Sequence, residues 1–241
     1  MNTIRAWMKM SGLIASIVAY ILWFYLLLPF KKDQLIWGLS LRRSWMKLAH
    51  WILGLRVEIK GTIPEKNGLV VCNHQSAIDP FIPMRYLELF PVGKYEIRSY
   101  PLIGFAASKT GILFVKREVR DHRRAVREKI REYLSLGRSI LVFPEGTVSP
   151  DGTIMPFRTG AFRSAVEAGR PVYPVAIRYF SADDRWQDGD SLYRHFVRQV
   201  GKRSIEVDLT CCDPVEGTDS DVSAEQAQSA IESALKREAG R

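Results

Sequence analysis

Hydrophobic residues form one long uninterrupted run near the start of the chain and only short runs elsewhere. From Met10 to Phe30 there is no charged residue, with Arg5 and Lys9 before the run and a charged stretch at 31–33 after it. About 20 apolar residues can cross the hydrocarbon core of a bilayer as a helix. The pattern therefore predicts a membrane-associated helix. A cleaved signal peptide is the alternative, but the run is long and no small-x-small cleavage site follows it.

A second helix with two different faces is predicted over Gln34–Leu53. Its polar residues Ser40, Arg43, Lys47 and His50 recur every three or four positions, and apolar residues with three tryptophans occupy much of the rest. Such a helix either packs on the protein core or lies at a membrane interface, and its cations and tryptophans favour the interface. Two topologies stay open, because the first helix can cross the bilayer or the pair can form a hairpin in one leaflet. Positive charge is denser after the apolar run than before it, which predicts that the following domain faces the cytoplasm in either topology.

Beyond Gly54, short β-branched runs alternate with helical segments. The predicted strands are Arg56–Ile59, Leu69–Cys72, Ile112–Val115, Ser139–Phe143, Val172–Ile177 and Ile205–Leu209. The predicted helices are Asp79–Leu89, Asp121–Leu136, Phe157–Ala168 and Val222–Lys236. This alternation predicts an α/β layered domain with a mainly parallel central sheet flanked by helices. We therefore expect an N-terminal two-helix membrane anchor over 1–53 and an α/β domain over 54–241.

Composition narrows the class of partner. The 241 residues include 35 Lys and Arg against 26 Asp and Glu, and the net charge of +9 favours an anionic partner such as nucleic acid or an anionic leaflet. No zinc-finger or aromatic single-strand signature is found, so the apolar N-terminus favours the membrane. Cys72, Cys211 and Cys212 form no disulfide framework and no Cys-x-x-Cys pair, so neither disulfides nor structural zinc are expected. Three histidines lack partners at ligand spacing and are expected to be structural or solvated: His50, His122 and His195.

A polar turn that carries a histidine follows the predicted strand Leu69–Cys72. The turn runs from Asn73 to Pro80, with His74 on the turn and Asp79 where the next helix begins. Imidazole removes protons near neutral pH, and a carboxylate on its other nitrogen fixes the tautomer and stabilises the imidazolium. The alternative is that Asp79 caps the helix while His74 is an ordinary loop residue. The pair by itself does not decide between them.

Two further segments place polar groups at the ends of predicted strands. In 143–149, Gly146 permits unusual backbone angles, although the segment could be a simple glycine turn. In 111–117 a strand delivers Lys116 and Arg117 at its carboxyl end, and an arginine fork there suits a phosphate. The alternative for these two cations is a solvated surface pair. Because functional groups of parallel α/β sheets gather at the carboxyl ends of strands, both segments are candidate site loops.

Together these segments resemble the glycerolipid acyltransferase family, which includes bacterial and eukaryotic lysophosphatidate acyltransferases. Four blocks match the family in its order: Asn73-His74 to Asp79, Gly111 to Arg117, Phe143 to Thr147, and Tyr173 to Ile177. The resemblance covers about residues 50 to 210. One block would mean little, but four in order are highly specific.

The resemblance implies direct acyl transfer without a covalent acyl-enzyme. His74, oriented by Asp79, would deprotonate the acceptor hydroxyl, which attacks the thioester of acyl-coenzyme A or acyl carrier protein. By the family pattern, Arg117, Glu145 and Gly146 would help to hold the headgroup of the acceptor. Gly-x-Ser-x-Gly is absent, and no Ser or Cys has a recognisable nucleophile setting. The implied partners are membrane lipids, a lyso-lipid acceptor and the acyl donor, with no nucleic acid, no metal and no cofactor beyond that co-substrate.

One departure from the family pattern concerns the acceptor. Many members have Arg after Glu-Gly-Thr, where this chain has Val148 after Thr147. Lys116, Arg117 and Arg158 could compensate, and lysophosphatidate, giving phosphatidate, is the first expectation. Another lysophospholipid or a lyso-aminolipid is an alternative acceptor. Two further hypotheses are a thioesterase, in which the same pair activates water, and a non-catalytic lipid-binding adaptor.

Overall fold

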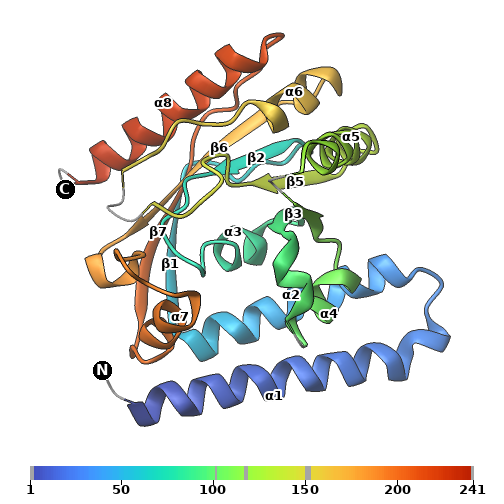
Figure 1. Ribbon diagram of the computed structural model, residues 1–241, viewed down its shortest axis with the longest axis vertical. Helices are drawn as coiled ribbons and strands as arrows, with labels where there is room; N and C mark the ends of the chain where they lie inside the picture. The colour runs from blue at the N-terminus through green and yellow to red at the C-terminus, as the bar shows by residue number, and fades with distance from the viewer. Residues whose placement is uncertain (1–2, 101, 117–118, 150–152, 240–241) are drawn as a thin grey trace.

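The computed structural model describes residues 3–100, 102–116, 119–149 and 153–239, and they form one mixed sheet with helices on both faces (Figure 1). The strands are β1 (Leu55–Lys60), β2 (Leu69–Cys72), β3 (Leu89–Lys94), β4 (Leu113–Val115), β5 (Ser139–Val142), β6 (Val172–Tyr179) and β7 (Ile205–Cys211). The α-helices are α1 (Thr3–Leu27), α2 (Gln34–Leu53), α3 (Phe81–Tyr86), α4 (Ile103–Lys109), α5 (Arg120–Ser135), α6 (Gly160–Glu167), α7 (Leu192–Val200) and α8 (Ser220–Ala239). Short 3-10 turns lie at Leu28–Phe30, Tyr95–Ser99 and Ala182–Asp184.

The strand order is β1-β7-β6-β2-β5-β3-β4. From β6 to β4 all neighbours are parallel, whereas β7 runs antiparallel to β6 and pairs in parallel with β1. The prediction of a mainly parallel sheet flanked by helices is confirmed. In this arrangement the carboxyl ends of β2, β4, β5 and β6 meet at one edge, where α/β sheets place their sites.

The sheet buries apolar side chains on both faces. On one face Val71 and Ile140 pack with α5, α6 and α8, through residues such as Leu134 and Phe162. On the other face Val70 packs with α2 and α3. Because successive strand residues point to opposite faces, the adjacent residues Val70 and Val71 contribute to different cores. Burial on both sides explains why β2 reads as a continuous apolar run.

Several predicted boundaries differ from those observed. The helix predicted over Asp79–Leu89 is the single short helix α3, because Leu89 starts β3, a strand that the sequence did not suggest. The proline in the middle of β3 argues against a strand in the sequence, since proline cannot donate a hydrogen bond to a neighbouring strand. Pro91 pairs with Leu141 of β5, while β4 pairs with β3 only from Val92 onward. The helices α4 and α7 were also not predicted.

The first two helices pack side by side along the lower edge of the molecule (Figure 1). Lys9 Nζ of α1 donates to the carbonyls of Leu53 and Lys202, each across 2.8 Å. Trp45 of α2 donates to Ser16 of α1 across 3.0 Å. Thus α1 contacts both its neighbouring helix and the α/β domain.

The α2 helix matches its predicted bounds and is docked on the domain through a buried cation. Arg42 donates to the carbonyls of Thr110 (2.6 Å) and Leu89 (2.5 Å). Its opposite side leaves Ile36 and Trp51 exposed. The sequence left open whether this helix packs on the protein core or lies at a membrane interface. The structure shows features of both, because one face packs on the domain while apolar residues on the other face are exposed.

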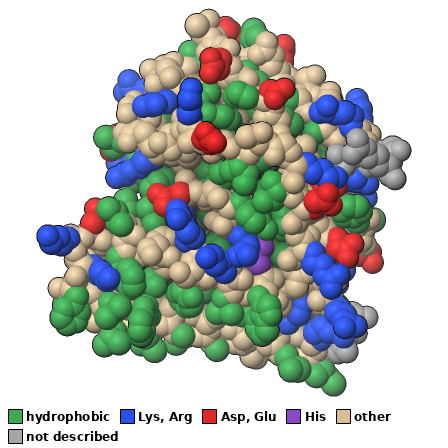
Figure 2. Space-filling view, turned by 180° about the vertical axis from the view of Figure 1, so that it is seen from behind, with side chains coloured by type: hydrophobic (Ala, Val, Ile, Leu, Met, Phe, Trp, Pro, Cys, Tyr) green, Lys and Arg blue, Asp and Glu red, His purple; other side chains and the backbone are tan. Residues whose placement is uncertain are grey.

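The outer face of α1 is strongly apolar. Among the described residues, one helical segment, Thr3–Phe30, is long and apolar enough to span a membrane, with a mean hydropathy of 2.2 over an 18-residue window. Large apolar side chains on it are exposed, with Phe30 at 80% and Ile4 at 74%. Figure 2 shows apolar side chains gathered along this lower edge of the molecule. Exposed apolar area on this scale is typical of a surface that contacts membrane or another protein.

Candidate active site

The imidazole of His74 and the carboxylate of Asp79 are in direct contact just after β2. His74 Nδ1 lies 2.8 Å from Asp79 Oδ2. Since an ionised carboxylate can only accept, Nδ1 carries the proton and Nε2 keeps a free lone pair. The side chain of His74 is 16% exposed and Asp79 is fully buried. The site therefore presents an oriented imidazole base at the surface, held by a carboxylate beneath it.

Asp79 is held by hydrogen bonds to both of its oxygens. Oδ2 also accepts from the backbone amides of Gln75 (2.7 Å) and Ser76 (2.8 Å), and Oδ1 accepts from the hydroxyl of Tyr179 (2.5 Å). The alternative in which Asp79 caps the following helix is wrong, because α3 begins after Pro80 without a side-chain cap. The carboxylate instead closes the turn back onto His74.

The turn is fixed to the sheet by Asn73 and by the loop after β5. The side-chain amide of Asn73 donates to the carbonyl of Ile177 and accepts from its amide, across 2.9 and 2.7 Å. The carbonyl of His74 accepts from Ser149 N at 2.9 Å. The ring of Phe143 stacks on the imidazole, with centroids 4.4 Å apart. These contacts leave His74 little freedom to turn away.

Glu145 is buried under the histidine turn. Oε1 accepts from the amide of His74 at 2.6 Å, and Oε2 accepts from the amide of Met155 at 3.0 Å. Burial raises the pKa of Glu145, and the two amide hydrogen bonds oppose that shift. The carboxylate of Glu145 therefore joins two loops, one at His74 and one at Met155. Its predicted role in holding the acceptor headgroup stays a prediction.

Gly146 and Arg158 are neighbours beside Glu145. Gly146 has a φ of 79°, and a Cβ built there would lie 2.8 Å from the Cζ of Arg158. The left-handed backbone favours glycine here, and the guanidinium of Arg158 lies directly against it. Arg158 is exposed and donates its backbone amide to Pro144 across 3.0 Å. The structure therefore places a cation directly over the Glu145-Gly146 turn.

Two further predicted residues, Lys116 and Thr147, follow strands β4 and β5 at the same edge. Lys116 follows β4 and places its ammonium 4.5 Å from the ring centroid of Tyr95. Thr147 is exposed and Val148 is half-buried. Arg117 lies outside the described residues.

A buried histidine on α7, His195, supports the turn. His195 Nε2 lies 2.8 Å from Ser76 Oγ, and His195 Nδ1 lies 3.0 Å from a guanidinium nitrogen of Arg198. Burial, assisted by the charge of Arg198, lowers the pKa of His195, which favours the neutral ring. Ser76 is itself fully buried, so this contact supports the turn and exposes no nucleophile.

Tyr179 and His195 were missed as site residues, for different reasons. Tyr179 ends β6, beside β2, so its position at a strand end was the available signal. His195 was expected to be structural, which agrees with its burial, but its link to Ser76 had no sequence signal. The cysteines Cys72, Cys211 and Cys212 are free thiols. No group of three potential metal ligands is found among the described residues.

Comparison with known protein sequences gives three findings. The family model described as "Acyltransferase" matches residues 54–178. A lyso-ornithine lipid O-acyltransferase of Pseudomonas aeruginosa is 34% identical over 202 residues, covering 81% of this chain and 78% of the relative. A 1-acyl-sn-glycerol-3-phosphate acyltransferase of Neisseria gonorrhoeae is 30% identical over 173 residues, 66% of each chain.

A solved structure has the same fold over the full length. The crystal structure of a 1-acyl-sn-glycerophosphate (LPA) acyltransferase from Thermotoga maritima matches with a TM-score of 0.78 at 22% identity. The match covers 100% of this chain and 97% of that chain.

Proposed function

This chain belongs to the acyltransferase family, and we propose that it transfers a fatty acyl group from a thioester to the free hydroxyl of a membrane lysolipid. The observation that carries the proposal is the hydrogen-bonded pair of His74 and Asp79, in which a buried carboxylate holds Nδ1 of a partly exposed imidazole and leaves Nε2 to act as the base. General base catalysis of this kind contributes about 10² to 10⁴ in rate.

In this reaction Nε2 of His74 removes the proton of the acceptor hydroxyl. The hydroxyl oxygen attacks the thioester carbonyl, an ester bond forms, the carbon–sulfur bond breaks, and the thiolate takes the proton back from the imidazolium. Asp79 stabilises the imidazolium while it exists. The hydrogen bonds from Gln75, Ser76 and Tyr179 keep the carboxylate in place, so that the imidazole needs little reorientation.

The acceptor that we favour carries a carboxylate headgroup, as in a lyso-ornithine lipid. Two observations support this choice: Val148 stands where a phosphate-binding arginine would be, and the Pseudomonas relative matches the larger share of the chain. Arg158, over Gly146, is the cation suited to hold that carboxylate through its planar fork. Lysophosphatidate is the second candidate, supported by the Neisseria relative and by the additional cation Lys116.

We also propose that α1 and α2 hold the enzyme on the membrane. The exposed apolar face of α1, together with Ile36 and Trp51 of α2, would enter one leaflet as a hairpin. The contacts of Lys9 and Ser16 with the rest of the protein favour this arrangement over a separate spanning helix. The α/β domain would then lie on the cytoplasmic side.

The test uses the full-length protein purified in detergent, acyl-coenzyme A as donor, and a panel of lyso-lipids that includes lyso-ornithine lipid and lysophosphatidate. Acylated product is expected with the wild type, and a loss of at least about a hundredfold with His74→Ala. Undiminished transfer by that variant would refute the assigned base. Free fatty acid released at the same rate with or without a lyso-lipid would identify the protein as a thioesterase. Absence of any turnover that depends on His74 would favour the adaptor.

A further inference from the structure

A hollow lined by arginines lies between α5 and α6, outside the His74 turn. Its volume is about 510 Å³. Four guanidinium side chains line it together with three small or apolar residues: Arg123, Arg127, Arg158 and Arg163, with Phe157, Thr159 and Gly160. We refer to it as the arginine cavity. Its size falls in the range of about 300–1,000 Å³ that is usual for small-molecule sites.

The two helices are packed so that α5 directs its arginines over the start of α6. A Cβ built on Gly160 would lie 3.4 Å from the Cδ of Arg127, so the stem of Arg127 runs across the first residue of α6. Ser164 Oγ donates to the carbonyl of Arg127 across 2.9 Å, which fixes the helices in this register. Arg123 and Arg127 are four residues apart on one face of α5, an arrangement of like charges that destabilises a helix.

Three of the four arginines that line the cavity are not matched by carboxylates of the described residues. Within the described ranges of the chain, Arg127, Arg158 and Arg163 form no ion pair. By contrast, Arg131, one turn further along α5, contacts Glu128 at 2.5 Å and Glu167 at 3.9 Å. On this helix Arg131 is thus paired with two carboxylates, whereas Arg127, at the cavity, has no carboxylate partner among the described residues. A bound polyanion would remove this repulsion.

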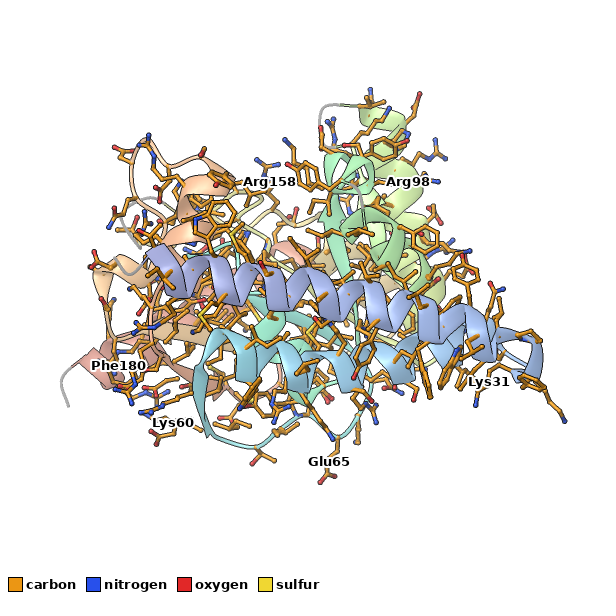
Figure 3. All side chains as sticks on the ribbon, turned by 90° about the horizontal axis from the view of Figure 1, so that it is seen from below. Lys31, Lys60, Glu65, Arg98, Arg158 and Phe180 are labelled. Carbon is orange, nitrogen blue, oxygen red and sulfur yellow. The ribbon has the colours of Figure 1, made fainter. Side chains whose placement is uncertain are left out.

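The arginine cavity adjoins the catalytic turn through Arg158, which lines it and also lies over Gly146. It lies among the helices that cover the face of the sheet away from α1 and α2 (Figure 1). Viewed from the side of α1, Arg158 lies beside that helix and not beneath it (Figure 3). Arg158 therefore links the cavity to the catalytic turn.

We propose that the arginine cavity binds the phosphate groups of the acyl donor, as a nucleotide-bearing thioester of the acyl-coenzyme A class. The inference rests on the proposed function. The charge on a pyrophosphate and a ribose phosphate matches several guanidiniums, whose forks suit phosphate oxygens. A lysolipid acceptor has a single anionic headgroup and an acyl chain that holds it at the apolar edge. The donor must bring a soluble, polyanionic end to the same reaction, and the arginine cavity offers that end a place on the solvent side.

The experiment compares two donors in the full-length enzyme in detergent, at saturating lyso-lipid. Acyl-coenzyme A carries the phosphates, and the matching S-acyl-pantetheine lacks them. The variants are Arg127→Ala, Arg163→Ala and the double variant, with Arg131→Ala as the control from the same helix. Each cavity variant is expected to raise the KM for acyl-coenzyme A about tenfold and to leave kcat/KM for acyl-pantetheine unchanged. Arg131→Ala should change neither.

A binding measurement gives a readout that does not depend on turnover. Coenzyme A should raise the thermal unfolding midpoint of the wild type and of Arg131→Ala, and that shift should disappear in the double variant. An unchanged preference for acyl-coenzyme A over acyl-pantetheine in the double variant would overturn the proposal. So would a rise in the KM for the lyso-lipid, which would assign the cavity to the acceptor. If the wild type transfers no acyl group from either donor, that result would instead contradict the proposed function.

Discussion

The hydroxyl of Tyr179 donates to Oδ1 of Asp79 across 2.5 Å, joining two residues that lie 100 positions apart. Both groups are buried. Burial and the adjacent Asp79 carboxylate raise the pKa of Tyr179, so the phenol remains protonated and serves as a donor. The contact leaves Oδ2 to accept from His74. Tyr179 is therefore a positioning residue for the base.

Replacing Tyr179 with Phe should weaken catalysis without removing the base. The change leaves a buried carboxylate oxygen without its donor, which costs about 1–3 kcal/mol. Activity with every acceptor is expected to fall about tenfold or more, mostly in kcat. Steady-state kinetics with the two lyso-lipids provide the measurement. An unchanged kcat in a normally folded variant would show that Oδ1 does not need this donor.

Glu145→Gln tests whether Glu145 braces the two loops. A glutamine has one acceptor oxygen, so it can satisfy the amide of His74 or that of Met155 but not both. We expect the free energy of unfolding to fall by about 1–3 kcal/mol, with a lower kcat. Chemical denaturation and kinetics on one preparation measure both effects. If only the KM for the lyso-lipid rises, Glu145 binds the headgroup, as the family pattern implies.

Val148→Arg tests the acceptor assignment. The substitution restores the cation that many family members carry after Glu-Gly-Thr. It should raise kcat/KM for lysophosphatidate relative to lyso-ornithine lipid by about tenfold, since one added charge-assisted contact is worth about 1.5–3 kcal/mol. Competition between the two acceptors in one assay gives the ratio directly. A wild type that already prefers lysophosphatidate would reverse our choice of acceptor.

His50 should make stability depend on pH. Its ring donates to the carbonyl of Phe81 across 2.8 Å, and burial lowers its pKa from 6.5 to about 4. Between those values the unfolded chain binds a proton at this position that the folded chain does not. The contribution of His50 to the free energy of unfolding is complete above pH 6.5. It falls by about 1.4 kcal/mol per pH unit as the pH drops towards 4.

The matched variant for this prediction is His50→Gln, which has no charge to gain in that range. The free energy of unfolding, measured by denaturation at several pH values, should decline less steeply in the variant between pH 6.5 and 4. Parallel curves for wild type and variant would contradict the prediction.

The sequence by itself determined the class of the domain, most strand positions, the family and the candidate base. These follow from local information. Strand and helix periodicity extends over a few residues, and the pair of His74 and Asp79 is formed within one turn. The first helical segment was also recognisable, since its apolar run needs no partner to be detected. Even so, β3 was missed, because Pro91 breaks the local signal while the pairing with β5 tolerates it.

The tertiary structure decided what surrounds the base and where charge accumulates. Strand order places β6 beside β2, and this brings Tyr179 to Asp79. Helix packing brings His195 to Ser76 and sets Arg127 over Gly160. Each of these contacts joins residues from separate elements, and no periodicity or short motif specifies which elements become neighbours. Contacts within a turn are fixed by the backbone geometry of a few residues, whereas contacts between remote elements depend on how the apolar faces of the whole chain are buried together.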